Sequence, residues 1–253
     1  MPDTATALVN DNDQDAPHLS QFERVVDTFI EPSKTFRDIK RNRSWWLPFV
    51  IIAVLGYVFS FAAVQHVGWD SLSTNVLKSQ PKNAERLEKG TPAEQARMLA
   101  VTKGFIEGFM AGGPVVLLVF NALFALILWG CFAFLLGGTT NYGEMFAVSI
   151  FAALPAALST LIAIATVLAS DPQTYNLNLP TPAALAYFLD PSAPAWLLSI
   201  GKSLDIFSLW SLALSGFGGA IVAKVKPMRG VLVVFGLWLL YVIVKTGLAA
   251  AFS

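Results

Sequence analysis

The chain has 253 residues, of which 55% are hydrophobic and only 13% charged, and its mean hydropathy is +0.59. Soluble domains carry about a quarter charged residues, so this composition excludes an ordinary soluble enzyme and indicates an integral membrane protein. The 17 basic and 17 acidic residues cancel, which argues against nucleic acid as a partner because nucleic acid would require a basic field.

The first 19 residues are polar and acidic. They contain four aspartates, no lysine or arginine, and no apolar run long enough for the core of a signal peptide. We expect residues 1–19 to form a disordered tail, so that the first hydrophobic span itself directs insertion into the membrane.

Residues 20–44 have the pattern of an amphipathic helix lying at the lipid surface. Ser20 and Glu23 have the spacing of a capping box, in which each side chain bonds the other residue's backbone amide at a helix start. Apolar residues then recur on one helical face, and basic residues follow on the next turns. We expect five aromatic side chains to anchor this segment at headgroup depth: Phe22, Phe29, Phe36, Trp45 and Trp46. The alternative is a helix packed on a soluble partner domain, for which this chain has no candidate.

Five hydrophobic stretches follow, each close to the ~20 residues that a helix needs to cross ~30 Å of hydrocarbon. They are continuous apolar runs, whereas a transmembrane β-strand alternates over ~10 residues. The predicted spans are Leu47 to Val64, Pro114 to Leu136, Met145 to Leu168, Leu204 to Ala223 and Val231 to Phe252. The sequence therefore predicts an all-α membrane protein, with a bundle of five transmembrane helices in residues 45–253.

The loop between the first two predicted spans contains a further helix signal. Thr91 and Glu94 have the spacing of a second capping box, and Pro92 occupies the first helical position, which proline favours. We expect an extramembrane helix here, which is either a cap over the outer end of the bundle or a simple connector.

The distribution of lysine and arginine predicts the orientation in the membrane. Six basic residues precede the first span, and Lys224, Lys226 and Arg229 lie between the fourth and fifth spans, whereas the loop from Ala169 to Trp196 has none. Positive charge favours the cytoplasmic side. We therefore expect a multi-pass protein of the inner (plasma) membrane with a cytoplasmic N-terminus and an external C-terminus, although the first loop, which would be external, also contains basic residues.

Two segments resemble bacterial Yip-domain proteins. The stretch from Phe29 to Ile39, followed by Trp45-Trp46-Leu47-Pro48, is similar to the entry of that family's membrane domain. The stretch from Gly137 to Phe146, continuing to Leu154-Pro155, is similar to the family's short polar loop into the third span. The resemblance covers roughly residues 22–252 and includes the number of spans.

The resemblance implies a polytopic membrane protein without an agreed biochemical activity. Eukaryotic relatives associate with prenylated Rab-type GTPases and help to shape or traffic membranes. Their Asp-Leu-Tyr-Gly-Pro type signature is absent from this chain, which argues against a GTPase-binding role.

Sequence signatures of catalysis are missing. The chain has no His-Glu-x-x-His pair, no Gly-x-Ser-x-Gly elbow and no phosphate-binding Gly-x-x-x-x-Gly-Lys-Ser/Thr loop. Two histidines, His18 and His66, and a single cysteine, Cys131, offer almost no material for a metal site. We expect no catalytic residue, no metal and no cofactor.

Small residues recur every fourth position along the fourth span, at Ser211, Ser215 and Gly219. Such a row allows two helices to approach closely. It predicts helix packing, either within the chain or against a protein partner or a second copy.

Ionisable residues inside the predicted spans are the more informative polar signal. Asp205 lies about 21 residues before the turn that joins the last two spans and Lys245 about 18 residues after it, so their depths differ by ~5 Å. Asn121 of the second span lies at a similar depth, and Pro155 should kink the third span. Three interpretations of the polar cluster remain open: a buried ion pair, a polar vestibule for an ion or small solute, or side chains that extend separately to the outer surface.

Together these patterns favour a non-enzymatic membrane organiser or adaptor whose partners are the lipid bilayer and a protein. The alternative is a small transporter or channel that uses the polar residues in the outer half of the bundle.

Overall fold

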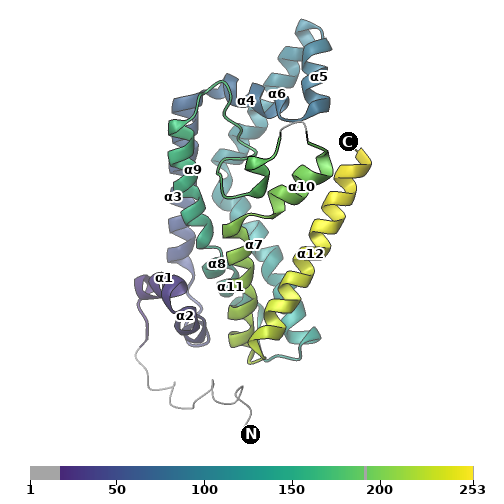
Figure 1. Ribbon diagram of the computed structural model, residues 1–253. Coiled ribbons are helices and arrows are strands. Elements are labelled where there is room, and N and C mark those ends of the chain that lie inside the picture. Colours follow the sequence, from purple (N-terminus) through teal and green to yellow (C-terminus); the bar gives the residue numbers. More distant parts are fainter. Residues whose placement is uncertain (1–17, 191–192, 253) are drawn as a thin grey trace. The chain divides into compact units, whose positions relative to one another are not determined.

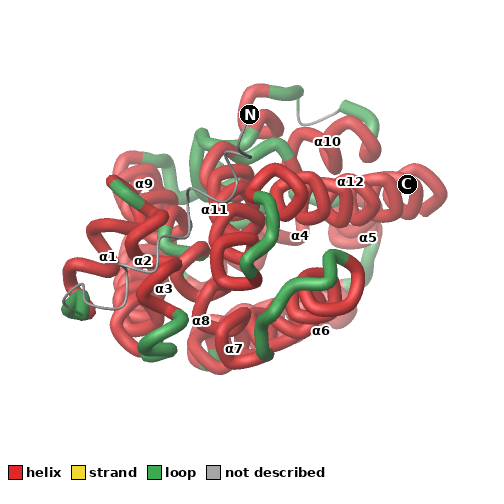
Figure 2. The backbone as a smooth tube through the Cα atoms, turned by 90° about the horizontal axis from the view of Figure 1, so that it is seen from below, coloured by secondary structure: helices red, strands yellow, loops and turns green. Residues whose placement is uncertain are grey.

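The computed structural model describes residues 18–190 and 193–252, so most of the predicted acidic tail lies outside the described residues. Within those ranges the chain consists of helices and loops and contains no strand (Figure 2). The helices labelled in Figure 1 are α1 (Gln21–Ile30), α2 (Pro32–Ile39), α3 (Trp46–Val67), α4 (Trp69–Lys78), α5 (Pro81–Lys89), α6 (Pro92–Ala111), α7 (Gly113–Gly130), α8 (Tyr142–Ala152), α9 (Pro155–Ala169), α10 (Ala195–Ser203), α11 (Ile206–Ala223) and α12 (Pro227–Phe252). A π-helical turn, η3 (Cys131–Leu135), continues α7, and a short 3-10 helix, η4 (Leu185–Phe188), precedes α10.

Five helical stretches of the described residues are long and apolar enough to cross a membrane, which confirms the predicted fold class. Their mean hydropathies lie between 1.7 and 2.5. The stretches are Trp46–Val67, Gly113–Leu135, Tyr142–Ala169, Ile206–Ala223 and Pro227–Ala251. Each overlaps one of the predicted spans, so the protein is an all-α, multi-pass membrane protein.

The third span contains a break at the predicted proline. α8 ends at Ala152, two turn residues follow, and α9 begins with Pro155. Proline has no amide hydrogen to donate to the preceding turn and is favoured at a helix start. The helical hydrogen-bond ladder is therefore interrupted at the position where the sequence predicts a kink.

The chain divides into two compact units. The first comprises Met1–Phe49, Asn121–Ala152 and Leu212–Phe235, and the second comprises Val50–Phe120, Ala153–Ser211 and Gly236–Ser253.

In the first unit, three glycines allow an aromatic ring and two helices to come together. A Cβ on Gly219 or Gly230 would lie 2.7 or 2.9 Å from the ring of Phe132, which is completely buried. A Cβ on Gly230 would also clash with the carbonyl oxygen of Gly216, so α11 and α12 touch through backbone. Phe132 lies in η3, which ends with a hydrogen bond from the Leu136 amide to the Cys131 carbonyl (2.9 Å), and the Gly138 amide then donates to the Phe132 carbonyl (2.8 Å). This centre is close-packed and has no room for an added methyl group.

The N-terminal helices α1 and α2 belong to the same unit and pack side by side (Figure 2). The capping box that the sequence predicts is present: the Ser20 hydroxyl accepts from the Glu23 amide (3.2 Å) and the Glu23 carboxylate accepts from the Ser20 amide (2.7 Å). These hydrogen bonds lower the pKa of Glu23. α1 ends before Pro32, which opens α2. The predicted single amphipathic segment is therefore a hairpin of two short helices.

The second unit contains the first loop, where the structure has more helix than the sequence predicts. The expected capping box of Thr91 and Glu94 opens α6, but α4 and α5 precede it, and α4 packs against α6. The side chain of Asn75 in α4 donates to the carbonyls of Pro172 and Tyr175, both at 3.0 Å. Two loops that are far apart in sequence are thus joined by hydrogen bonds.

Candidate functional site

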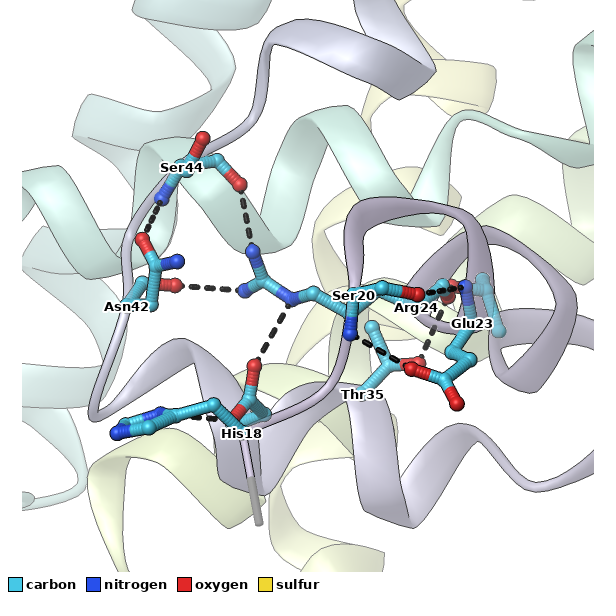
Figure 3. Close-up of polar contacts among 9 residues, drawn as sticks. His18, Ser20, Glu23, Arg24, Thr35, Asn42 and Ser44 are labelled. Atoms are coloured by element: carbon cyan, nitrogen blue, oxygen red, sulfur yellow. Dashed lines mark hydrogen bonds and ion pairs between the residues drawn. The ribbon is translucent and has the colours of Figure 1, made fainter.

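The most deeply buried charge in the described residues is Arg24, on α1 of the first unit. Its side chain is completely inaccessible to solvent. The guanidinium donates to the carbonyl of Ser44 (2.7 Å) and to that of Asn42 (2.6 Å), and its Nε lies 3.2 Å from Asp38 (Figure 3). The carbon of the guanidinium lies 4.7 Å from the centre of the Phe151 ring, a cation–π distance. A planar group with five donors suits such a multidentate role, which lysine could not fill.

The partner carboxylate, Asp38 on α2, is only 5% exposed. Burial lowers the pKa of Arg24, and the charge of Asp38 acts in the opposite direction. The imidazole Nδ1 of His18, which is exposed, lies 3.9 Å from the second oxygen of Asp38. A buried charge pair of this kind is costly to break, because removing either partner leaves the other one charged, buried and without a counter-ion.

Two threonines complete this polar centre. Thr28 on α1 and Thr35 on α2 both donate their hydroxyl hydrogens to the carbonyl of Arg24, at 2.7 and 2.8 Å. Both threonines are completely buried. The bond from Thr35 crosses from one helix to the other, so α1 and α2 are fixed together by both the backbone and the side chain of Arg24.

A second polar centre gathers around Glu144, at the start of α8. One of its oxygens, Oε2, accepts from the ammonium of Lys40 (3.1 Å), the hydroxyl of Thr140 (2.9 Å) and the amide of Asn141 (3.2 Å). Asn141 in turn accepts from the Glu144 amide at 3.1 Å. Residues 141 and 144 therefore form a capping box for α8, and the salt bridge to Lys40 connects this box to the end of α2.

The loop before α8 also contacts the end of α11. The amide of Thr139 donates to the carbonyl of Ala223 (3.0 Å), while the carbonyl of Thr139 accepts from Lys40 (2.8 Å). A Cβ on Gly138 would lie 2.8 Å from both the Cβ and the carbonyl oxygen of Ala223, so only glycine allows this approach. α2, the loop and α11 are thus joined in one chain of hydrogen bonds.

We call these two centres together the N-terminal clasp, defined by Arg24, Asp38, Lys40 and Glu144 with their hydrogen-bond partners. The clasp fastens the α1–α2 hairpin to α8 and α11. Its charges face one another or backbone carbonyls, so it is suited to holding two parts of the unit in a fixed arrangement.

The five expected interface anchors divide into two groups. Phe22 is 71% exposed and Trp46 is 53% exposed, and Phe29 is partly buried. Phe36 is completely buried, and a Cβ on Gly218 would lie 2.5 Å from its ring. The expectation that Phe36 faces lipid is therefore wrong, because its ring fills the space that Gly218 leaves on α11.

Trp45 behaves differently from its neighbour Trp46. Its ring lies 5.1 Å from that of Phe146 on α8 and 5.7 Å from that of Phe49, both in edge-to-face arrangements. It therefore contributes to packing within the first unit, while Trp46 projects outward.

The expected intramembrane polar residues do not lie in one unit. Asn121 is buried in the first unit, whereas Asp205 and Lys245 belong to the second. The Asp205 carboxylate accepts from the Ser208 amide (2.7 Å) and so caps α11, and the Lys245 ammonium donates to the hydroxyl of Ser203 (2.7 Å). In the described part of the chain these two residues thus have separate partners and form no ion pair.

The predicted row of small residues on α11 packs against other parts of the same chain. Ser215 is buried, and Gly219 lies against the ring of Phe132. Ser211 precedes them on the same helix. An interface with a second copy through Gly219 would require Phe132 to leave its place.

Sequence reasoning missed the clasp itself. It treats Arg24 as a charge that sets orientation and Lys40 as such a charge and part of the basic side of the interface segment, and it does not treat Asp38 or Glu144 as site residues. One signal was available for Glu144, since Asn141 stands three residues before it in a capping-box pattern. For Arg24 the local sequence offers no comparable signal, because its acceptors are carbonyls about twenty residues away.

Comparison with known proteins agrees with this architecture. The Yip1 domain matches residues 26–248, which include α2, the Glu144 loop, the first four candidate spans and most of the fifth. The chain is also 31% identical to "Membrane protein YknW" of Bacillus subtilis (strain 168) over 225 residues, covering 85% of this chain and 88% of that protein. No solved structure matches the chain. Lys40, which directly follows the first segment that resembles Yip-domain proteins, binds Glu144 of the second segment. The chain belongs to the Yip1 domain family.

Proposed function

We propose that this protein is a non-enzymatic membrane organiser or adaptor, whose working surface is the α1–α2 hairpin. The observation that carries the proposal is the N-terminal clasp. The fully buried Arg24 of α1 donates hydrogen bonds to the chain that leads into α3 and so holds the hairpin in place. The exposed side chains of the hairpin are not needed for these bonds.

The outward side of the hairpin has the composition of a docking surface. Phe22 and Ile30 are 71% and 77% exposed, and Glu31 and Lys34 form an exposed pair at 2.6 Å that raises the pKa of Lys34. Large apolar side chains beside basic residues are suited to a lipid headgroup region or to an amphipathic partner helix. Holding this surface rigidly avoids part of the ordering cost of binding.

The orientation of the protein is part of the proposal. The basic residues that precede α3 and those between α11 and α12 belong on the cytoplasmic side, which leaves the C-terminus outside the cell membrane. Reporter fusions test this: a fusion in the turn before Pro227 should report the cytoplasm, and a fusion at the C-terminus should report the outside. A cytoplasmic signal from both sites would contradict the orientation.

The adaptor role can be tested by photo-crosslinking in native membranes. A photoreactive amino acid in place of Ile30 should give a discrete adduct, with lipid or with a protein, and Arg24→Met should abolish it by releasing the hairpin. Arg41→Met, which removes an exposed charge from the same segment, is the matched control and should leave the adduct unchanged. An adduct that is unaffected by Arg24→Met would contradict the role of the clasp.

A flux assay separates this proposal from the transporter alternative. Purified protein in sealed proteoliposomes should show no solute-specific flux under the adaptor proposal. Saturable flux that Lys245→Met abolishes would favour the transporter instead.

A further inference from the structure

The outer surface of the second unit contains a cavity of about 400 Å³ between α10 and α12. Its walls are almost entirely apolar, with Trp238, Leu239 and Val242 from α12 and Ile200 and Leu204 from the α10 side. Cavities of this size hold small ligands in other proteins. The apolar walls predict an equally apolar occupant, such as a hydrocarbon chain.

α10 is held in place from its other side, so the cavity does not close by collapse of the helix. A Cβ on Gly201 would lie 2.9 Å from Leu189 and 3.0 Å from the backbone of Ala186, so α10 already touches η4. The Leu185 amide donates to the Leu204 carbonyl (3.0 Å), and the Ile206 amide donates to the Ala183 carbonyl (3.2 Å). These contacts fix both ends of the turn from α10 into α11.

One edge of the cavity carries hydroxyl groups and positive charge. Ser203 and Thr246 both line it. The Ser203 hydroxyl accepts from Lys245 (2.7 Å), and the Thr246 hydroxyl donates to that of Ser199 (3.4 Å). The ammonium of Lys245 also lies 5.6 Å from the centre of the Tyr241 ring.

Two lysines adjoin this edge of the cavity. Lys202, which is exposed on α10, directly precedes Ser203, whose hydroxyl accepts from Lys245. Asp205 is close in sequence, but its carboxylate oxygen accepts from the Ser208 amide. Among the described residues no carboxylate forms an ion pair with either lysine. Two like charges at the edge of a hydrocarbon-facing cavity are costly unless an anion joins them.

We infer that this cavity binds an anionic phospholipid, with an acyl chain between α10 and α12 and the phosphate at Lys202, Lys245 and the adjoining hydroxyls. The apolar walls select the chain, and the two ammonium groups select the negatively charged headgroup. Basic pockets beside membrane helices are a known means of binding acidic headgroups. The inference is independent of the adaptor proposal, which concerns the hairpin of the first unit.

Native mass spectrometry of the whole protein in mild detergent tests the inference. Phosphatidylglycerol should be retained in preference to phosphatidylcholine, and Lys245→Met or Lys202→Met should each lower that preference about fivefold, the effect of one charge at a membrane surface. Lys89→Met, which removes an exposed lysine of the same unit, should leave it unchanged. Equal retention of both lipids by the wild type, or an equal loss with Lys89→Met, would overturn the inference.

Two further measurements locate the chain and identify the source of the phosphate. Phosphatidylglycerol with a photoreactive acyl chain should label peptides of α10 and α12, and Val242→Phe, which fills the cavity while keeping both lysines, should prevent the labelling. Inorganic phosphate at the same concentration should not compete. Labelling that survives Val242→Phe would show that the chain is not held in the cavity, and displacement by inorganic phosphate would show that the site binds free phosphate rather than a lipid.

Discussion

The substitution Arg24→Met tests the clasp most directly. Methionine has a side chain of similar length but no charge, so the substitution removes the ion pair with Asp38 at 3.2 Å and both hydrogen bonds to carbonyls. The carbonyls of Asn42 and Ser44 belong to residues that are at least partly exposed, so they can turn to water. Asp38, at 5% exposure, cannot do so without opening the hairpin. The cost is therefore that of breaking a buried pair by removing one partner, about 3–5 kcal/mol.

This cost can be measured as a local opening of the hairpin. Ile39 is completely buried on α2, so a cysteine placed there reacts with a thiol reagent only when the hairpin opens. In a Cys131→Ser background carrying Ile39→Cys, Arg24→Met should raise the labelling rate by roughly two to three and a half orders of magnitude, since ~1.4 kcal/mol corresponds to a factor of ten. The matched control Arg41→Met should change the rate by less than about fivefold.

A double substitution separates a stranded charge from a general loss of packing. Arg24→Met with Asp38→Leu replaces the pair by apolar side chains, an exchange that is often neutral or stabilising in buried sites. The labelling rate should therefore fall back by at least about tenfold from that of Arg24→Met alone. A double variant that opens as readily as the single one, or a single variant indistinguishable from Arg41→Met, would refute the assignment of Arg24 as the centre of the clasp.

Three other predictions follow from the first unit. Gly219→Ala should lower the free energy of unfolding in detergent by about 1–3 kcal/mol, because the added Cβ would lie 2.7 Å from Phe132. The control Gly236→Ala, where nothing lies within 4 Å, should be neutral or slightly stabilising. Equal losses in the two variants would contradict the packing. Glu144→Gln should raise the labelling rate of the hairpin less than Arg24→Met does, because Lys40 is 27% exposed and keeps water as a partner, and an unchanged rate would show that the Glu144 contacts are dispensable. Brominated lipid should quench the fluorescence of Trp46 in a protein whose other tryptophans are replaced by phenylalanine, and absence of quenching would place Trp46 away from lipid.

The amino-acid sequence was sufficient for those parts of the fold that depend on local or purely apolar signals. Both capping boxes formed where Ser20 and Thr91 predict them, and the break in the third span fell at Pro155. Each span was detectable because a hydrocarbon environment requires a continuous apolar run. Such signals lie within a few residues or a single helix, so no knowledge of the tertiary arrangement is needed to interpret them.

The contacts that the sequence did not reveal are those that join distant segments. A helical stripe predicts which side chains share a face, but it does not say whether that face meets lipid or protein. For this reason the stripe predicts that Phe36 faces lipid, whereas its ring packs against Gly218. Matching depths similarly suggested a contact between Asp205 and Lys245. A comparison of depths does not take account of hydrogen-bond partners nearby in the sequence. For Asp205 such a partner is the amide of Ser208, in the first turn of the helix that Asp205 caps.

The chemistry of the clasp gives a reason why its sequence pattern is weak. Arg24 and Lys40 donate most of their hydrogen bonds to backbone carbonyls, which belong to residues 42, 44 and 139. The hydroxyls of Thr28 and Thr35 also donate to a backbone carbonyl, that of Arg24. Every residue supplies a carbonyl, so the acceptor positions can change their side chains without losing these bonds. Only the donors and the two carboxylates, with the glycines that allow close approach, are chemically restricted. Most of the specificity of the clasp therefore lies in the path of the backbone rather than in the side chains along it.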